Sequence, residues 1–127
     1  MELDFGKLDG LIPAVVQDRA DGRVLMVGFM NEEAFRKTVE TGYATFYSRS
    51  RNKLWTKGET SGHRILAKEI QTDCDRDTVL ILAEAQGPGV CHDGYRSCFY
   101  QTLQDGVWTL NDKRSFDPDA IYGDKTK

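Results

Sequence analysis

Apolar residues in the first quarter of the chain form two short blocks, and this pattern predicts a pair of strands. Residues 11–16 and residues 24–29 are apolar and contain several valines, which favour extended structure. Asp21 and Gly22, a pair typical of tight turns, lie between the two blocks. A β-hairpin is therefore expected from residue 11 to residue 29.

A helix is expected directly after this hairpin. Asn31 is a favourable N-cap, and the two glutamates that follow it suit the positive end of a helix dipole. Ala34, Phe35 and Val39 then provide one apolar face. Gly42 predicts the end of the helix after about three turns, because glycine readily adopts the left-handed conformation of a C-cap.

The rest of the chain alternates β-prone segments with turns. Expected strands cover residues 43–48, 54–55, 65–72 and 78–85, with a last hairpin formed by residues 98–103 and 107–110 around Asp105-Gly106. One clear helix among many short strands predicts an α+β fold with a mainly antiparallel β-sheet. The domain is expected to cover residues 1–110, and a polar C-terminal tail covers residues 111–127.

The overall composition narrows the class of protein. A chain of 127 residues suits one domain, and its net charge of −3 argues against general affinity for nucleic acid. No apolar run has membrane-spanning length, and the acidic N-terminus does not resemble a signal peptide. We therefore expect a cytoplasmic protein, in which the three cysteines are metal ligands or reactive thiols.

The cysteines have neighbours that favour a metal site. Cys74 lies between two aspartates, and His92 follows Cys91, whereas a cysteine in an apolar core usually has apolar neighbours. Thiolates suit zinc, so Cys74, Cys91 and Cys98 are candidate ligands. A fourth ligand such as His63 or His92 would make the site structural. If water takes the fourth position, the site can be hydrolytic.

Asp73, Asp75 and Asp77 alternate along the segment that contains Cys74. In an extended chain the three carboxylates would share one face, where they repel one another unless a cation joins them. Magnesium suits such a site, because it binds a few carboxylates and keeps several waters. The alternative is a solvated acidic turn. The segment is not an EF-hand loop, since the required glycine and distal glutamate are missing.

Residues 48–63 form the most basic segment of an otherwise acidic chain. They combine four cations with several hydroxyl groups, glycines and one tryptophan, which together favour phosphate binding. The alternative is a solvated hairpin tip. The candidate substrate contacts in and beside this segment are Arg49, Arg51, Lys53, Trp55, Lys57, Ser61 and Gly62.

Several strings resemble phosphoribosyl-AMP cyclohydrolases of histidine biosynthesis, in the monofunctional form. The most specific are WTKGETSGH (55–63), DCDRDT (73–78) and CHDGYRSCFY (91–100), and VLMVGFMNEEAF (24–35) and TFYSRSR (45–51) are similar too. The resemblance implies hydrolysis of 1-(5-phosphoribosyl)-AMP, in which the adenine ring opens between N1 and C6. The product would be the phosphoribosyl-formimino aminoimidazole carboxamide nucleotide, formed in the third step of the pathway.

The resemblance also implies cofactors and partners. Zinc would be bound by Cys74, Cys91 and Cys98, in a site shared across an intertwined homodimer. Cys74 would act with the two later cysteines of a partner subunit. Magnesium would be bound by Asp73, Asp75 and Asp77. A zinc-activated water is the expected nucleophile, with His92 as candidate general base and His63 as a second candidate catalytic residue.

Two residues depart from the family pattern. Asp93 stands where the family usually has threonine, and Tyr95 where arginine is common. Neither residue is a candidate ligand. We therefore expect the two departures to affect substrate specificity and pH optimum more than activity. An added carboxylate at Asp93 could hold the ring of His92 or raise its pKa.

Three other functions compete with this interpretation. A zinc module that only stabilises the fold would need a fourth protein ligand, and a thiol-reactive protein would have titratable thiols and no zinc. A nucleotide deaminase would carry H-x-E and P-C-x-x-C strings, which are absent from the sequence. A second, pyrophosphohydrolase domain, found in some relatives, has no room in a chain of this length.

Overall fold

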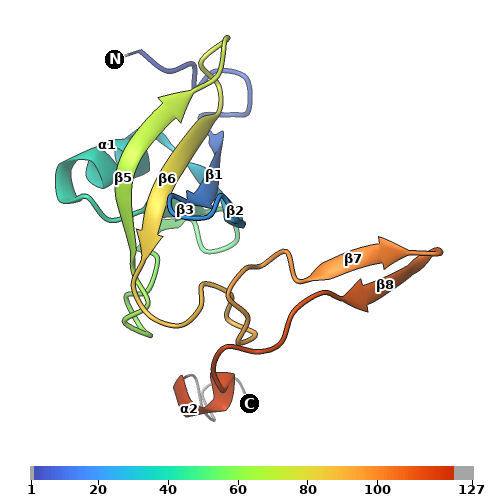
Figure 1. The fold of residues 1–127 in the computed structure, drawn as a ribbon. Helices are drawn as coiled ribbons and strands as arrows, with labels where there is room; N and C mark the ends of the chain where they lie inside the picture. The colour runs from blue at the N-terminus through green and yellow to red at the C-terminus, as the bar shows by residue number, and fades with distance from the viewer. Residues whose placement is uncertain (1, 122–127) are drawn as a thin grey trace.

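The centre of the fold is a four-stranded sheet with the order β2-β1-β6-β5 (Figure 1). The computed structural model describes residues 2–121. β1 (Ile12–Asp18) and β2 (Val24–Met30) form the predicted first hairpin, and β5 (Ile65–Thr72) pairs antiparallel with β6 (Val79–Ala85). Both antiparallel pairs confirm the expectation for these segments.

The middle of this sheet was not predicted, because β1 and β6 pair in parallel. The two strands carry alternating buried residues, with Ile12, Ala14 and Val16 facing the same core as Ile81 and Ala83. All other strand pairs are antiparallel. The fold is therefore α+β with mainly antiparallel strands and one main helix, as expected.

The helix α1 (Glu32–Thr41) has the predicted ends. The Asn31 side chain accepts a hydrogen bond from the amide of Ala34 at 2.8 Å, and Gly42 adopts a left-handed φ of 81° as the C-cap. The predicted apolar face was wrong at Val39, which is 48% exposed. Thr38 takes the inward position instead, since its hydroxyl donates to the Ala34 carbonyl and accepts from the Thr45 amide.

The third element of the core is the antiparallel hairpin of β3 (Thr45–Ser48) and β4 (Lys53–Thr56). Phe46 of this hairpin is fully buried and lies against Gly28 of β2. A Cβ at Gly28 would come within 2.6 Å of the phenylalanine ring, so this close contact requires glycine. The contact positions this hairpin, and with it the basic segment of residues 48–63, beside the main sheet.

The last hairpin, β7 (Gln101–Gln104) and β8 (Val107–Leu110), extends away from the body of the molecule (Figure 1). It keeps large apolar side chains exposed, including Trp108 at 66%. A short helix, α2 (Pro118–Ile121), was not predicted in the polar tail. Residues 122–127 of the predicted tail lie outside the described residues. Within residues 2–121, no helix is long and apolar enough to cross a membrane.

Candidate functional site

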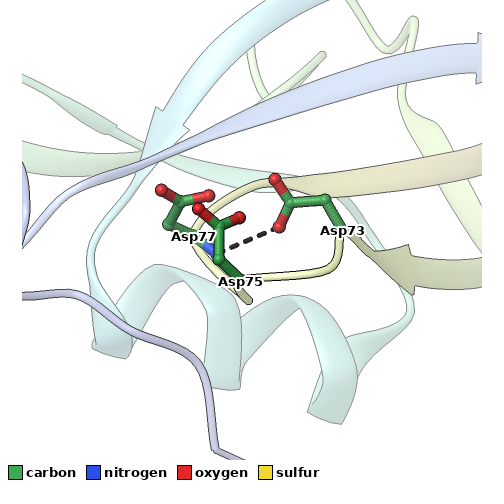
Figure 2. A group of neighbouring side chains, drawn as sticks. All are labelled: Asp73, Asp75 and Asp77. Carbon is green, nitrogen blue, oxygen red and sulfur yellow. Dashed lines mark hydrogen bonds between the residues drawn. The ribbon is translucent and has the colours of Figure 1, made fainter.

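The three aspartates lie together in the turn between β5 and β6 (Figure 2). One carboxylate oxygen from each lies within 4.8 Å of the others. The backbone bends at Arg76, whose φ is 60°, and Asp73 Oδ1 accepts hydrogen bonds from the amides of Asp77 and Thr78 at 3.1 and 3.3 Å. The turn therefore brings the predicted magnesium ligands to one point.

A lysine that sequence reasoning missed contacts this triad. Lys7 Nζ lies 2.9 Å from Asp75 Oδ2 and 3.1 Å from Asp77 Oδ2. Hydrogen bonds to Asp75 and then Asp77 raise the pKa of Lys7, and the bond from Lys7 lowers the pKa of Asp75 to about 2. The hydrogen bond from Lys7 acts to lower the pKa of Asp77. Desolvation and the carboxyl groups of Asp75 and Asp73 outweigh it, so the pKa of Asp77 is raised overall.

Two of the three cysteines lie together in the loop that follows β6. Cys91 is buried, with 3% of its surface exposed, whereas Cys98 lies at the surface. The two cysteines are near enough for Cys91 to affect the pKa of Cys98. Although the residue as a whole is exposed, neighbouring atoms shield the Cys98 thiol from water. This desolvation, and then the neighbouring Cys91, raise the pKa of Cys98 to about 12. In the metal-free protein Cys98 is therefore protonated at neutral pH.

Cys74 does not join this pair within one chain. It lies exposed in the β5–β6 turn. Among residues 2–121 the aspartate triad is the one group of three or more metal-binding side chains that converge. The predicted zinc ligands are thus divided between two places, with two thiols in one loop and the third in another.

An ion-pair cluster anchors the cysteine loop to the first hairpin. Arg96 Nη2 lies 2.9 Å from Asp18 Oδ2 and 2.8 Å from Asp21 Oδ2, and the Arg96 hydrogen bond lowers the pKa of Asp21. The Ser97 hydroxyl donates to the Val24 carbonyl at 2.7 Å, and the Cys98 amide donates to the Leu25 carbonyl at 2.8 Å. These contacts fix the end of the loop that carries Cys98.

The predicted phosphate segment borders a cleft of about 490 Å³. His92 lines it together with residues from 48 to 61, so the cysteine loop and the basic segment face the same space. Of the predicted substrate contacts, those that line the cleft are Arg51, Trp55, Lys57 and Ser61. Arg49, Lys53 and Gly62 do not line it. The Arg49 guanidinium lies over the Phe29 ring, at 4.3 Å from its centroid.

Lys57 connects this cleft to the thiol pair. Its ammonium is largely buried, and desolvation lowers the pKa of Lys57, while electrostatic interaction with Cys98 and then Cys91 acts in the opposite direction. The same lysine lines the cleft. Lys57 and His92 therefore connect the cleft to the cysteine loop.

The two predicted catalytic histidines differ in their surroundings. His63 is partly buried, its ring meets Phe116 edge-on at 4.9 Å, and its Nδ1 has no hydrogen-bond partner among the described residues. A buried polar atom without a partner is unusual in a purely structural residue. His92 is exposed, and its Nε2 lies 3.5 Å from Asp93 Oδ1.

Asp93, one of the two departures from the family pattern, is held from both sides of the loop. The Tyr100 hydroxyl donates to Asp93 Oδ2 at 2.8 Å, and this bond raises the pKa of Tyr100. The Tyr100 ring stacks on Tyr95, with centroids 3.8 Å apart. Arg114 from the predicted tail donates to the Asp93 carbonyl at 3.0 Å. The contact of Arg114 with Asp93 joins residues far apart in the chain, so no local pattern in the sequence indicated it.

Comparisons with known proteins agree with the resemblance noted above. The family described as Phosphoribosyl-AMP cyclohydrolase matches residues 26–100. A phosphoribosyl-AMP cyclohydrolase of Solibacter usitatus (strain Ellin6076) is 65% identical over 126 residues, covering 99% of this chain and 100% of the relative. One from Geotalea uraniireducens (strain Rf4) is 51% identical over 122 residues, covering 96% and 98%. One from Nitratidesulfovibrio vulgaris (strain DP4) is 50% identical over 119 residues, covering 94% of each.

Proposed function

The chain belongs to the phosphoribosyl-AMP cyclohydrolase family, and from that premise we propose that its cleft opens the adenine ring of 1-(5-phosphoribosyl)-AMP between N1 and C6. The observation that carries this proposal is the lining of the cleft, which combines Lys57 of the basic segment with His92, the residue that follows Cys91. Phosphate-binding groups and thiol ligands thus adjoin the same space. The proposed reaction takes place in the cytoplasm, as a step of histidine biosynthesis.

We propose that zinc is bound by Cys91 and Cys98 of one chain with Cys74 of another. Two adjacent thiols suit zinc, but they leave the ligand set incomplete. Cys74 is exposed and lies elsewhere in its own chain, so it is free to serve a second copy. When bound there, zinc would supply Lewis-acid activation of a water molecule.

An intertwined homodimer is consistent with the exposed apolar side chains of the β7–β8 hairpin. Leu103, Val107, Trp108 and Leu110 are each more than half exposed. Exposed apolar groups of this size usually mark an interface. We propose that a second copy of the chain covers this hairpin, and that the same assembly brings Cys74 to its partner's thiol pair.

The chain's own residues provide the remaining steps. We propose that Arg51, Lys57 and Ser61 hold phosphate oxygens, because they line the cleft with cationic and hydroxyl groups. Arg49, Lys53 and Gly62 do not line the cleft. They would contact the substrate only if a second subunit enlarges the cleft or if the substrate reaches beyond it. Trp55, also in the cleft wall, would pack against a ring of the nucleotide.

His92 is the proposed general base, since it lines the cleft next to a thiol ligand. It would accept a proton from the attacking water as oxygen bonds to C6. The C6–N1 bond then breaks, and N1 takes up a proton, which leaves an amide at C6 and a formimino group at N1. His63 is the second proposed catalytic group, because its unpaired Nδ1 can bind a polar atom of the substrate.

The aspartate triad has the donor set for magnesium: three carboxylate oxygens that converge and remain accessible to water. We propose that Asp73, Asp75 and Asp77 bind this ion. Residues 1–110 are the proposed catalytic domain. In the polar tail, the Phe116 amide donates to the Gly94 carbonyl and Arg114 donates to the Asp93 carbonyl, so both residues would stabilise the cysteine loop.

Subunit mixing tests the shared zinc site. Cys74→Ser and Cys91→Ser chains should each be inactive and bind little zinc. In a mixed dimer, one site contains only intact cysteines, so random exchange of subunits should restore roughly a quarter of wild-type activity and zinc content. Activity is measured as the ultraviolet change on ring opening.

The matched control mixes Cys91→Ser with Cys98→Ser. Both changes lie on the same side of the proposed site, so each site of the mixed dimer stays defective and no recovery is expected. A Cys74→Ser chain that is active alone would remove Cys74 from the site. Equal absence of recovery in both mixtures would place all three ligands in one chain.

A further inference from the structure

Lys7 reaches the aspartate triad from a compact N-terminal turn. The Gly6 amide donates to Asp4 Oδ1 at 2.8 Å, and the Gly10 amide donates to the Phe5 carbonyl at 2.8 Å. The Asp4 amide donates to the Arg76 carbonyl at 2.7 Å, which ties this turn to the acidic loop. The backbone around Lys7 is thus held in place before any ion is bound.

The Lys7 ammonium contacts two of the three carboxylates. It bridges Asp75 Oδ2 and Asp77 Oδ2, and both its side chain and that of Asp75 are about half exposed. Asp73 is held differently, through the backbone amides of Asp77 and Thr78. The third carboxylate is therefore fixed by the turn, and the other two are neutralised in part by lysine.

We propose that Lys7 is a tethered cation that occupies the acidic triad in the metal-free protein and is displaced when a divalent ion binds. This inference rests on the proposed magnesium site. Magnesium bound by the triad, at metal–oxygen distances of about 2.0–2.1 Å, would use the Asp75 and Asp77 carboxylates that Lys7 now contacts. Two cations on the same pair of carboxylates repel each other, and the doubly charged ion is held more strongly.

Two consequences follow from this exchange. Lys7 offsets part of the repulsion among three carboxylates, so it stabilises the loop while the site is empty. It also competes with the metal, so it weakens the apparent affinity of the triad for divalent ions. Displacement frees the ammonium, which becomes more exposed to reagents in solution.

Metal binding by a Lys7→Met variant tests the competition. Mn²⁺, a paramagnetic substitute for Mg²⁺, is titrated into the full-length protein at low salt, and the free ion is measured by electron paramagnetic resonance. Because exposed ion pairs are weak, we expect the variant to bind Mn²⁺ about two- to tenfold more tightly than wild type. Lys68→Met removes the same charge from an exposed position on β5 and should have a smaller effect.

Chemical labelling gives a second measurement that does not depend on activity. Acetylation of Lys7, followed by mass spectrometry, should proceed faster with saturating Mg²⁺ than without it, and Lys68 should react at the same rate in both. Equal or weaker Mn²⁺ binding by Lys7→Met, or Lys7 labelling unchanged by Mg²⁺, would overturn the inference. Mn²⁺ binding that is equal in wild type and Asp75→Asn would instead refute the magnesium site itself, and the inference with it.

Discussion

The loop of the aspartates and the loop of the cysteines are built in opposite ways. Asp73, Asp75 and Asp77 converge within one turn, because alternate residues of a short segment need only a local bend to meet. Cys91 and Cys98 share a loop that is closed by local hydrogen bonds and tied to the first hairpin by distant contacts, but Cys74 does not meet them within one chain. The local set of aspartates converges within one chain, whereas the dispersed set of cysteines would need the second copy that we propose.

The two loops also differ in their charge state before metal binds. The Lys7 ammonium lowers the pKa of Asp75 to about 2, so this carboxylate is ionised and ready for a cation at neutral pH. Desolvation raises the pKa of Cys98 to about 12, so its thiol must lose a proton when a metal binds. Metal binding at the cysteines should therefore release protons and depend steeply on pH, and binding at the aspartates should not.

The sharpest contrast comes from removing one ligand in each loop. Cys91→Ser should abolish bound zinc and lower kcat at least about a thousandfold, because the activating ion is lost. Asp75→Asn should retain zinc and mainly raise the Mg²⁺ concentration needed for half-maximal rate. Metal analysis and steady-state kinetics distinguish the two. Zinc loss in both variants would mean that the loops form one site.

His92→Ala tests whether the cysteine loop supplies chemistry as well as ligands. We expect kcat to fall by about 10²–10⁴-fold, the usual contribution of a general base, while zinc content stays at the wild-type level. His92→Gln, which can hydrogen-bond but cannot accept a proton at neutral pH, should be equally slow. A rate within a few-fold of wild type would remove His92 from the proton transfer.

Lys57→Ala probes the point where the cleft adjoins the cysteine loop. If Lys57 holds phosphate in both ground and transition states, KM should rise about tenfold with a smaller change in kcat. Lys53→Ala is the matched control, since Lys53 begins β4, the strand that ends directly before Lys57, but does not line the cleft. If both substitutions raise KM equally, phosphate binding depends on the overall positive charge of the segment and not on a specific contact with Lys57.

The smallest expected effect concerns the anchor of the cysteine loop. Arg96 lowers the pKa of Asp21, so their ion pair stabilises the folded state above the ordinary aspartate pKa and loses this effect as pH falls below about 4. Arg96→Met should therefore lower Tm by a few degrees at pH 7, and the difference should shrink in acid. A difference in Tm that stays constant down to pH 3 would point to packing instead.

Local signals predicted much of the fold. Asn31 and Gly42 marked the ends of α1, and Asp21-Gly22 marked the turn of the first hairpin. Side-chain direction was less predictable: Val39 was expected inside, but the two hydrogen bonds of Thr38 make burial of the threonine favourable. Helix α2 was missed because its four residues carry no periodic pattern.

By itself the sequence determined the local elements, the family and the groups of candidate ligands, because each depends on residues close together in the chain. Tertiary structure decided the parallel pairing of β1 with β6, the contact of Lys7 with Asp75, and the place of Lys57 beside two thiols. Such contacts join residues far apart in the chain, and they form only when burial of the core brings their backbones together. No spacing along the chain encodes them.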